Sequence, residues 1–349
     1  MPKSIIKNCK LDIKSSSLDR LVDAYLSQSV ATRVNVAQKH CVSTSTSGKV
    51  ASALVECGFA EQRLYADKGQ RPSLHLFIKE GLNALVIDLS RGVYTMSIIS
   101  PYGKCLFMRD HIYDTSLSYE DNLNVFLSRQ GYQAKMAQKS FYTISVIFSD
   151  SKHLNAAALS DLDAYVPTMH DKDKTDRVIR SVFKRQAITY TNLSDALFAA
   201  INFGVVPSTD VSCGASYLFI GAQINAFNVS SRGCVHCDIG SLIIDGDTCT
   251  ALTRNRVSSD ALELILTRIV NMMQCAFTSS SIIIDSDIYS LNEQMIRNIC
   301  RNCAKAGVLT PTVIASTNAS SITHTGAMKL ALSNFIRTMI HASDENANK

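Results

Sequence analysis

A run of hydroxyl side chains followed by one cation gives this sequence its clearest chemical signal. Residues 43–46 read Ser-Thr-Ser-Thr, and Lys49 follows three residues later. Short hydroxyls hydrogen-bond base edges and phosphate oxygens, and a lysine neutralises phosphate charge. We therefore expect the following side chains to face the major groove of a DNA duplex: Ser43, Thr44, Ser45, Thr46 and Lys49.

A second group of polar side chains flanks this run. Two stretches with strand composition, 59–65 and 74–78, are joined by Ala-Asp-Lys-Gly-Gln-Arg-Pro at 66–72. This pattern predicts a β-hairpin, or wing, with a basic tip. We expect the polar side chains of this group to contact the sugar-phosphate backbone or the minor groove: Arg33, Lys68, Gln70 and Arg71.

The elements that would position both groups form a helix-turn-helix. Thr32 can cap a short helix over 32–40, Ser43 can cap a second helix that ends near Glu56, and Gly58 can end it. The residues available for burial are Val34, Val36 and Ala37 in the first helix and Val50, Ala51 and Leu54 in the second. Two helices with a short turn form the helix-turn-helix pattern, although any short helical pair in a globular protein has the same appearance.

The distribution of charge favours the DNA-binding interpretation. Up to Lys79 the chain has twelve Lys and Arg against six Asp and Glu, a net charge of +6. The whole chain carries +5, so the remaining 270 residues carry −1. A solvated protein surface does not need this asymmetry, whereas neutralisation of DNA phosphates benefits from it.

Bulk composition predicts a cytoplasmic protein of two or three domains. The chain has 349 residues, of which 46% are hydrophobic, and its eleven cysteines are odd in number and scattered; this indicates reduced thiols. The first residues, MPKSIIKNCKLDIK, lack the apolar core of a signal peptide. The longest mostly apolar run, 196–206, is too short to span a bilayer, so we expect no membrane insertion.

Beyond residue 78 the pattern predicts an α/β body. Strand-like runs at 84–88, 94–100 and 104–110 form a meander, followed by helices at 119–128 and 176–184 and strands at 142–148 and 187–191. A similar alternation continues through 194–315, which suggests two α/β lobes of similar build. A last helix places five apolar residues on one face: Met328, Leu332, Phe335, Ile336 and Met339.

The order and spacing of several short motifs resemble the ROK family (repressors, open reading frames and kinases), in particular its NagC/XylR-like regulators. Thr-Arg-Val-Asn-Val-Ala at 32–37 is similar to the family's Ser-Arg-x-x-Leu-Ala, and Gly-Gln-Arg-Pro at 69–72 to its Gly-Arg-Arg-Pro. Ser-Arg-Gly-Val at 90–93, Cys-Asp-Ile-Gly-Ser at 237–241 and Thr-Gly-Ala-Met-Lys-Leu-Ala at 325–331 resemble further family motifs. Within the helix-turn-helix, Cys41 stands where the family has a turn glycine, and Ser47 where it has an apolar anchor.

The resemblance implies an architecture. It predicts an N-terminal winged helix-turn-helix (1–79) followed by a bilobal actin/hexokinase-like domain. That domain would divide into an N-terminal lobe (80–192) and a C-terminal lobe (193–349), with the last helix packing back on the first lobe.

Departures from the family pattern argue against sugar kinase activity. Arg91 and Val93 replace small residues of the first phosphate loop, two glycines of the second loop are missing at 221–225, and Asp285-Ser286 replaces a glycine pair. Phosphate loops need glycine where backbone approaches the ligand, so no ATP or other cofactor is expected.

The catalytic base that the resemblance implies is also missing. The family's Asn-Asp pair is Asn192-Leu193 here, and a leucine cannot accept a proton from a sugar hydroxyl. Asp195 is an alternative base two residues on, but its side chain is expected to point elsewhere on the turn. We therefore expect a protein that is not an enzyme.

We expect no metal site. Ser241 replaces the zinc-binding histidine, and only Cys249 remains of the family's cysteine cluster. The Cys234/Cys237 and Cys300/Cys303 pairs have a metal-like or redox-like spacing, but buried thiols explain such pairs equally well.

A sugar or sugar-phosphate effector would have Asn192 and Asp238 as its remaining ligands. Leu193 and Ser241 stand where the family has polar groups of its sugar pocket, so the resemblance implies a pocket with fewer hydrogen bonds to offer.

The resulting hypothesis is a sequence-specific DNA-binding transcriptional regulator, in particular a repressor, whose partners are a double-stranded DNA operator and a second copy of itself in a homodimer or higher oligomer. The alternative is a degenerate ROK scaffold that acts by protein–protein interaction, including heterodimerisation with an intact regulator. Such a scaffold would bind DNA only through sequence-independent electrostatic attraction, or not at all, and would therefore show no preferred DNA sites.

Overall fold

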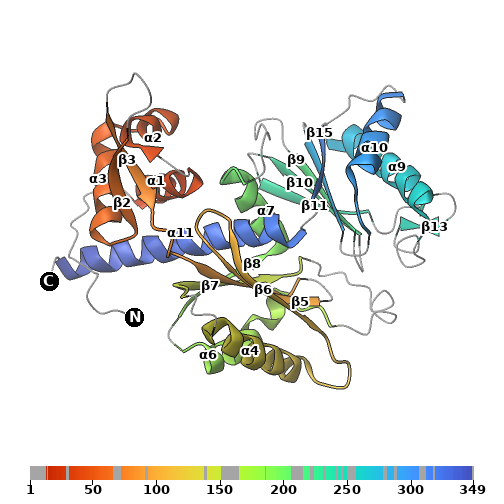
Figure 1. Ribbon diagram of the computed structural model, residues 1–349, viewed down its shortest axis with the longest axis horizontal. Coiled ribbons are helices and arrows are strands. Elements are labelled where there is room, and N and C mark those ends of the chain that lie inside the picture. The colour runs from red at the N-terminus through yellow and green to blue at the C-terminus, as the bar shows by residue number, and fades with distance from the viewer. Residues whose placement is uncertain are drawn as a thin grey trace.

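A computed structural model shows how these segments fold. It describes residue 13 and the ranges 15–28, 31–65, 72–90, 93–136, 140–150, 165–184, 186–205, 215–220, 224–230, 233–239, 243–244, 247–249, 257–277, 281–286, 289–305, 312–316 and 319–347. The described chain forms a small N-terminal unit beside a body of two sheets, with one long C-terminal helix between the unit and the nearer sheet (Figure 1). None of the described helices is both long and apolar enough to cross a bilayer.

The N-terminal unit is a winged helix. Its elements are α1 (Ser15–Ser27), β1 (Ala31–Thr32), α2 (Arg33–Lys39), α3 (Thr44–Glu56), β2 (Ala60–Tyr65) and β3 (Ser73–Ile78). The three strands form one sheet in the order β1-β3-β2, and β2 and β3 are antiparallel. The predicted helix-turn-helix and hairpin are therefore confirmed; the predicted wing tip, 66–71, lies outside the described residues.

Local side-chain chemistry sets the limits of α2 and α3. The Thr32 hydroxyl accepts the Asn35 N–H at 3.1 Å, and the Ser43 hydroxyl accepts the Thr46 N–H at 3.0 Å. Each bond satisfies one amide that the helix start leaves unpaired. Gly58 ends α3 at φ +77°, and Cys41 adopts φ +51° in the turn, the only positive φ of a non-glycine residue in the described chain. The turn thus keeps its left-handed backbone without the glycine that usually provides it.

The first lobe of the body is a five-stranded sheet with helices on both faces. Its elements are β4 (Ala84–Asp88), β5 (Val93–Ile99), β6 (Cys105–Ile112), α4 (Tyr119–Met136), β7 (Thr143–Phe148), η1 (Met169–Asp171), α6 (Lys172–Val182) and β8 (Ala187–Asn192). The strand order is β6-β5-β4-β7-β8, antiparallel from β4 to β6 and parallel from β4 to β8. Helices α4 and α6 cover one face, and the C-terminal helix covers the other (Figure 1).

The second lobe repeats this topology. Its elements are α7 (Leu193–Asn202), β9 (Ala215–Ile220), β10 (Ile224–Ser230), β11 (Gly233–Asp238), β12 (Ile243–Ile244), β13 (Asp247–Thr248), α9 (Ser259–Phe277), β14 (Ser281–Ser286), α10 (Glu293–Lys305) and β15 (Thr312–Ser316). The order β11-β10-β9-β14-β15 has the same antiparallel and parallel halves as the first sheet. The predicted α/β class with two similar lobes is confirmed.

The structure corrects three sequence expectations. Helix α6 begins at Lys172 rather than at 176; a reciprocal capping box of Thr168 and Asp171 starts the short helix η1, which leads directly into α6. Strands β11 to β13 were not predicted, because these short segments lack a clear apolar alternation. Val34 is 50% exposed rather than buried, whereas Val36 and Ala37 are buried as expected.

The C-terminal helix α11 (Ala319–Ala347) contacts the winged helix through α1, the first sheet through β4, β7 and β8, and the second lobe through α7. Its predicted apolar face is buried at Met328, Leu332 and Ile336. At Gly326 a Cβ atom would lie 2.0 Å from the Ala196 carbonyl oxygen of α7, so only glycine allows the two helices to come this close.

Candidate nucleic-acid interface

Helix α3 presents a polar start to solvent and an apolar stripe to the unit. Thr44, Ser45 and Lys49 are exposed, whereas Val50, Ala51 and Leu54 are fully buried. The helix packs on α2, β2 and α1, and it lies on the side of the unit that is farthest from both lobes (Figure 1). Its first turns are therefore accessible to a macromolecular partner.

Three other residues predicted to contact DNA, Ser43, Thr46 and Arg33, make contacts within the winged helix. The Ser43 and Thr46 hydroxyls lie 2.8 Å apart, and Ser43 also caps the helix, so both serve the helix start. Arg33 is half-buried, and a Cβ on Gly48 of α3 would lie 3.6 Å from its Cδ atom. Lys68, Gln70 and Arg71 lie outside the described residues. DNA contact by each of these residues stays a prediction.

A polar cluster that the sequence did not reveal ties the three helices of the unit together. Ser47 is fully buried; its hydroxyl lies 2.7 Å from the Tyr25 hydroxyl of α1 and donates to the Arg33 carbonyl oxygen of α2 at 3.0 Å. The Tyr25 hydroxyl also donates to the Ser47 carbonyl oxygen at 3.1 Å. Burial raises the pKa of Tyr25. Ser47 thus replaces an apolar anchor with hydrogen bonds that fix α3 on α1 and α2.

Helix α11 holds the winged helix by charged and polar groups. The Lys329 ammonium is buried and donates to the Leu26 carbonyl oxygen at the end of α1. Ser333 donates to the Asp23 carboxylate at 2.5 Å. The Arg337 guanidinium pairs with Asp23 at 2.6 Å and donates to the Asp19 carbonyl oxygen at 3.1 Å. These contacts fix the orientation of the winged helix relative to the body.

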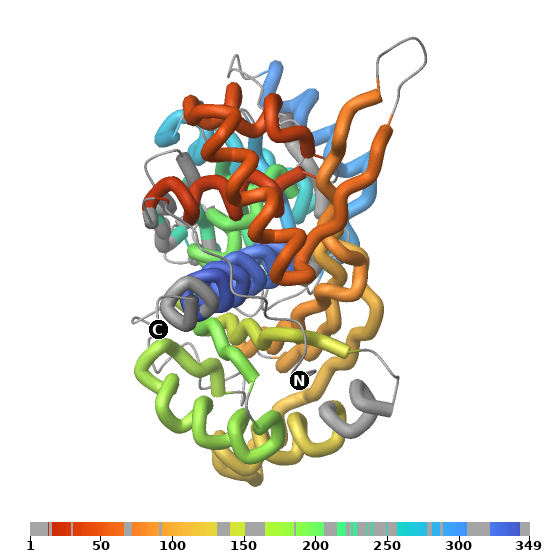
Figure 2. The backbone as a smooth tube through the Cα atoms, turned by 90° about the vertical axis from the view of Figure 1, so that its left-hand side faces the viewer, coloured from red at the N-terminus to blue at the C-terminus, as the bar shows by residue number. Residues whose placement is uncertain are grey.

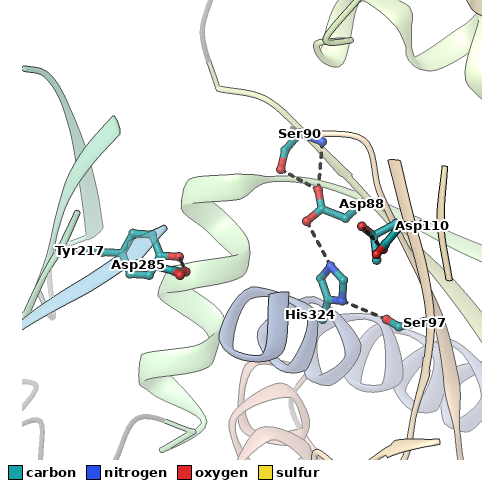
Figure 3. Close-up of polar contacts among 8 residues, drawn as sticks. Asp88, Ser90, Ser97, Asp110, Tyr217, Asp285 and His324 are labelled. Atoms are coloured by element: carbon teal, nitrogen blue, oxygen red, sulfur yellow. Dashed lines mark hydrogen bonds and ion pairs between the residues drawn. The ribbon is translucent and has the colours of Figure 1, made fainter. Parts of the chain in front are cut away.

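The end of β4 and the segment that follows it, where the resemblance implies a phosphate loop, are hydrogen-bonded to each other and to α11. Asp88, at the end of β4, accepts the Ser90 amide at 2.9 Å and the Ser90 hydroxyl at 2.6 Å. Its other oxygen lies 3.1 Å from Nε2 of His324 on α11, and His324 Nδ1 lies 3.0 Å from the Ser97 hydroxyl (Figure 3). Asp88, Ser97 and His324 are all buried. A nucleophilic serine must be accessible to substrate, so this serine–histidine–aspartate set is a structural tie between β4, β5 and α11.

Two further carboxylates of the body are bound internally. In the second lobe Tyr217 donates to Asp285, and both side chains are buried (Figure 3). Asp150 accepts the Ser194 amide at 2.8 Å and the Ser194 hydroxyl, so it caps the start of α7. Sequence reasoning missed this cap because Asp150 and Ser194 lie 44 positions apart.

The resemblance implies positions for a kinase base and two effector ligands. The described residues at these positions do not form a catalytic arrangement. Leu193 is buried, Asn192 is half-buried and makes no side-chain cap, and Asp195 is exposed. The side chain of Asp238 lies outside the described residues.

For the Cys300/Cys303 pair, which the structure describes, the burial of the thiols agrees with the interpretation that they pack as apolar side chains. Cys303 is buried, which raises its pKa, and Cys300 is half-buried. The side chains of Cys234 and Cys237 lie outside the described residues. The described residues contain no group of three or more histidine, cysteine or acidic side chains arranged to hold a metal ion.

The fold matches solved structures of the ROK family. A ROK family transcriptional regulator, a homolog of the E. coli MLC protein, superimposes with a TM-score of 0.62 at 12% identity, over 94% of this chain and 99% of that one. A ROK family glucokinase from Streptomyces griseus, solved with glucose and AMPPNP, superimposes with a TM-score of 0.50 at 10% identity, over 71% of this chain and 99% of that one.

No family model and no curated protein matches the sequence. The likeness therefore concerns the fold: this chain has the fold of a ROK transcriptional regulator, a winged helix-turn-helix joined to an actin-like, kinase-type body. The predicted resemblance is confirmed at this level.

The Tyr25–Ser47 cluster predicts a coupled pair of mutations. Ser47→Ala should lower the free energy of unfolding by about 0.5–1.5 kcal/mol, because the Tyr25 hydroxyl and the Arg33 carbonyl each lose a hydrogen bond to the Ser47 hydroxyl. Tyr25→Phe should destabilise the Ser47→Ala variant less than it destabilises the wild type. A double-mutant cycle measured by urea unfolding should give a coupling energy of at least about 0.5 kcal/mol. Ser45→Ala, on the exposed face of the same helix, is the control and should change little. Strict additivity would show that the cluster does not tie the helices.

Burial of Lys329 predicts a pH dependence. Burial lowers the pKa of Lys329 from its ordinary 10.5 to about 8. Between these values the unfolded chain binds more protons than the folded one, so this group makes stability rise with pH across that window. Between about pH 8 and pH 10.5 the unfolding free energy of the wild type should therefore increase relative to that of Lys329→Met. Parallel pH curves for the two proteins would contradict a buried Lys329.

Proposed function

We propose that this protein is a sequence-specific, DNA-binding transcriptional regulator, and in particular a cytoplasmic repressor. The observation that carries the proposal is the outward-facing start of α3, where Thr44, Ser45 and Lys49 stand exposed on a winged helix. Hydroxyls and a cation at the start of a recognition helix suit base edges and phosphates in a major groove. The fold likeness to a protein described as a transcriptional regulator supports the same function.

The proposal includes a division of labour along the chain. Residues 1–79 bind DNA, and the lobes 80–192 and 193–349 pair two copies. Two winged helices related by a two-fold axis place their α3 helices in successive major grooves, about 34–36 Å apart. Arg33, Lys68, Gln70 and Arg71 hold the sugar-phosphate backbone or the minor groove on either side.

The body is proposed to lack sugar kinase activity. Leu193 replaces the base and is buried, and Asp150 takes up the free amide and hydroxyl of Ser194 at the start of α7. Asp88 is bound to Ser90 and His324. A sugar kinase needs a general base near the sugar hydroxyl that reacts. We also expect a sugar or sugar-phosphate effector, which would rely on Asn192 and Asp238, to bind this protein more weakly than an intact ROK regulator, because Leu193 and Ser241 replace polar groups of the family's sugar pocket.

Removal of two cations should abolish specific retention of DNA. We take as probe the duplex that wild-type protein enriches most from a random pool. In a gel shift, Lys49→Ala with Arg71→Ala should reduce affinity for it by at least about tenfold, and the salt dependence should become shallower by about one for each phosphate contact removed. Lys174→Ala, which removes an exposed cation from α6, is the matched control and should bind as wild type.

The same assay separates the two candidate functions. A regulator shows preferred duplexes that bind well above the electrostatic background. A degenerate scaffold, whose partner is another protein, would show only that background or no binding, and unchanged retention by the double variant would remove the proposed reading face.

A further inference from the structure

The wing has two faces, and one of them ends in an unusual apolar pair. In the β2–β3 register, Ala60 stands opposite Ile78 and Leu64 opposite Leu74. At the base of the hairpin this face is buried, at Ala60, Leu76 and Ile78. At its distal end the same face carries Leu64, 75% exposed, and Leu74, 40% exposed.

On the opposite face of the wing, the polar side chains contact one another or neighbouring aromatic rings. Arg63 bonds Glu61, and its guanidinium lies 5.3 Å from the centre of the Phe77 ring. The His75 ring lies 5.3 Å from the Tyr65 ring, and its Nε2 lies 2.6 Å from the Ser73 hydroxyl. The polar side chains of the hairpin are therefore occupied on one side, while two adjacent leucines face solvent on the other.

Such a pair indicates a binding surface. Burying a leucine side chain contributes about 1.5–3 kcal/mol, and hairpin strands that have no partner usually carry polar residues at this position. Both leucines lie on the same face of the hairpin as the residues that are buried at its base. This face is the one on the side of the helices. Strands β2 and β3 lie side by side along one edge of the unit, next to its helices (Figure 2).

The positive charge of the winged-helix unit indicates which kind of partner covers the two leucines. Residues 1–79 carry +6 and the rest of the chain −1, so the partner that approaches this unit is polyanionic. A duplex read by α3 also offers apolar surface, because deoxyribose carbons line the minor groove walls, and minor-groove proteins use apolar side chains there. We propose that Leu64 and Leu74 form an apolar contact with the minor groove edge of the duplex bound by α3. This inference rests on the proposed function.

The contact can be tested with variants that keep the charge. Leu64→Gln with Leu74→Gln should weaken binding to the enriched duplex about 5- to 30-fold, a loss of roughly 1–2 kcal/mol. The slope of log affinity against log salt should stay at the wild-type value, because no phosphate contact is removed. Ile112→Gln is the matched control, since Ile112 is 81% exposed on β6, outside the winged helix, and should bind as wild type. Thermal unfolding should be the same for all three proteins, because the side chains are exposed.

The outcomes distinguish the inference from the proposed function. If wild type prefers the duplex and the leucine variant binds it equally well, the apolar contact is wrong and the regulator remains. If wild type enriches no duplex at all, the proposed function itself fails. If the leucine variant becomes monomeric in sedimentation while its intrinsic DNA affinity is unchanged, the surface belongs to a second copy of the chain, and the proposal is overturned.

Discussion

The close approach of α11 and α7 at Gly326 constrains where the other elements of this protein lie. A side chain at that position would meet the Ala196 carbonyl oxygen at 2.0 Å, so the two helices touch through their backbones. From this crossing α11 runs along the first sheet and continues under α1 of the winged helix (Figure 1). One helix therefore contacts both lobes and the winged helix.

Contacts along the middle of α11 hold the winged helix against it. Lys329 and Arg337 bond carbonyl and carboxylate groups of α1, and Phe59 of the winged helix packs edge-on against Phe335 at 5.8 Å. Leaving Lys329 or Asp23 without its partner would cost the desolvation energy of a charged group. A displacement of α11 would therefore have to move the winged helix with it. Near its N-terminal end the same helix carries His324, which is bonded to Asp88.

Three carboxylates of the body have hydrogen-bond partners within the protein. Asp88, Asp150 and Asp285 each bond a hydroxyl of the protein, from Ser90, Ser194 and Tyr217. A buried carboxylate is stable only when such partners are present. With the bond of Asp88 to His324, these bonds join β4 to α11, the start of α7 to the first lobe, and β14 to β9, so the three carboxylates stabilise the fold.

Local rules predicted much of the winged helix, and long-range contacts account for what they missed. Thr32, Ser43 and Gly58 were recognisable as caps because a cap depends on neighbouring residues only. The strand 84–88 was predicted with its observed limits because it is apolar and bounded by turn residues. The Tyr25–Ser47 bond and the Asp150 cap join residues 22 and 44 positions apart, which no periodicity can reveal.

The central claim is that the start of α3 enters a DNA major groove, and a footprint of the wild-type protein tests it most directly. Hydroxyl-radical cleavage and guanine N7 methylation interference on the enriched duplex report backbone protection and major-groove contact separately. The account predicts two protected stretches, each with interfering guanine N7 positions, whose centres are about one helical turn apart. Uniform protection with no interfering guanine would contradict it.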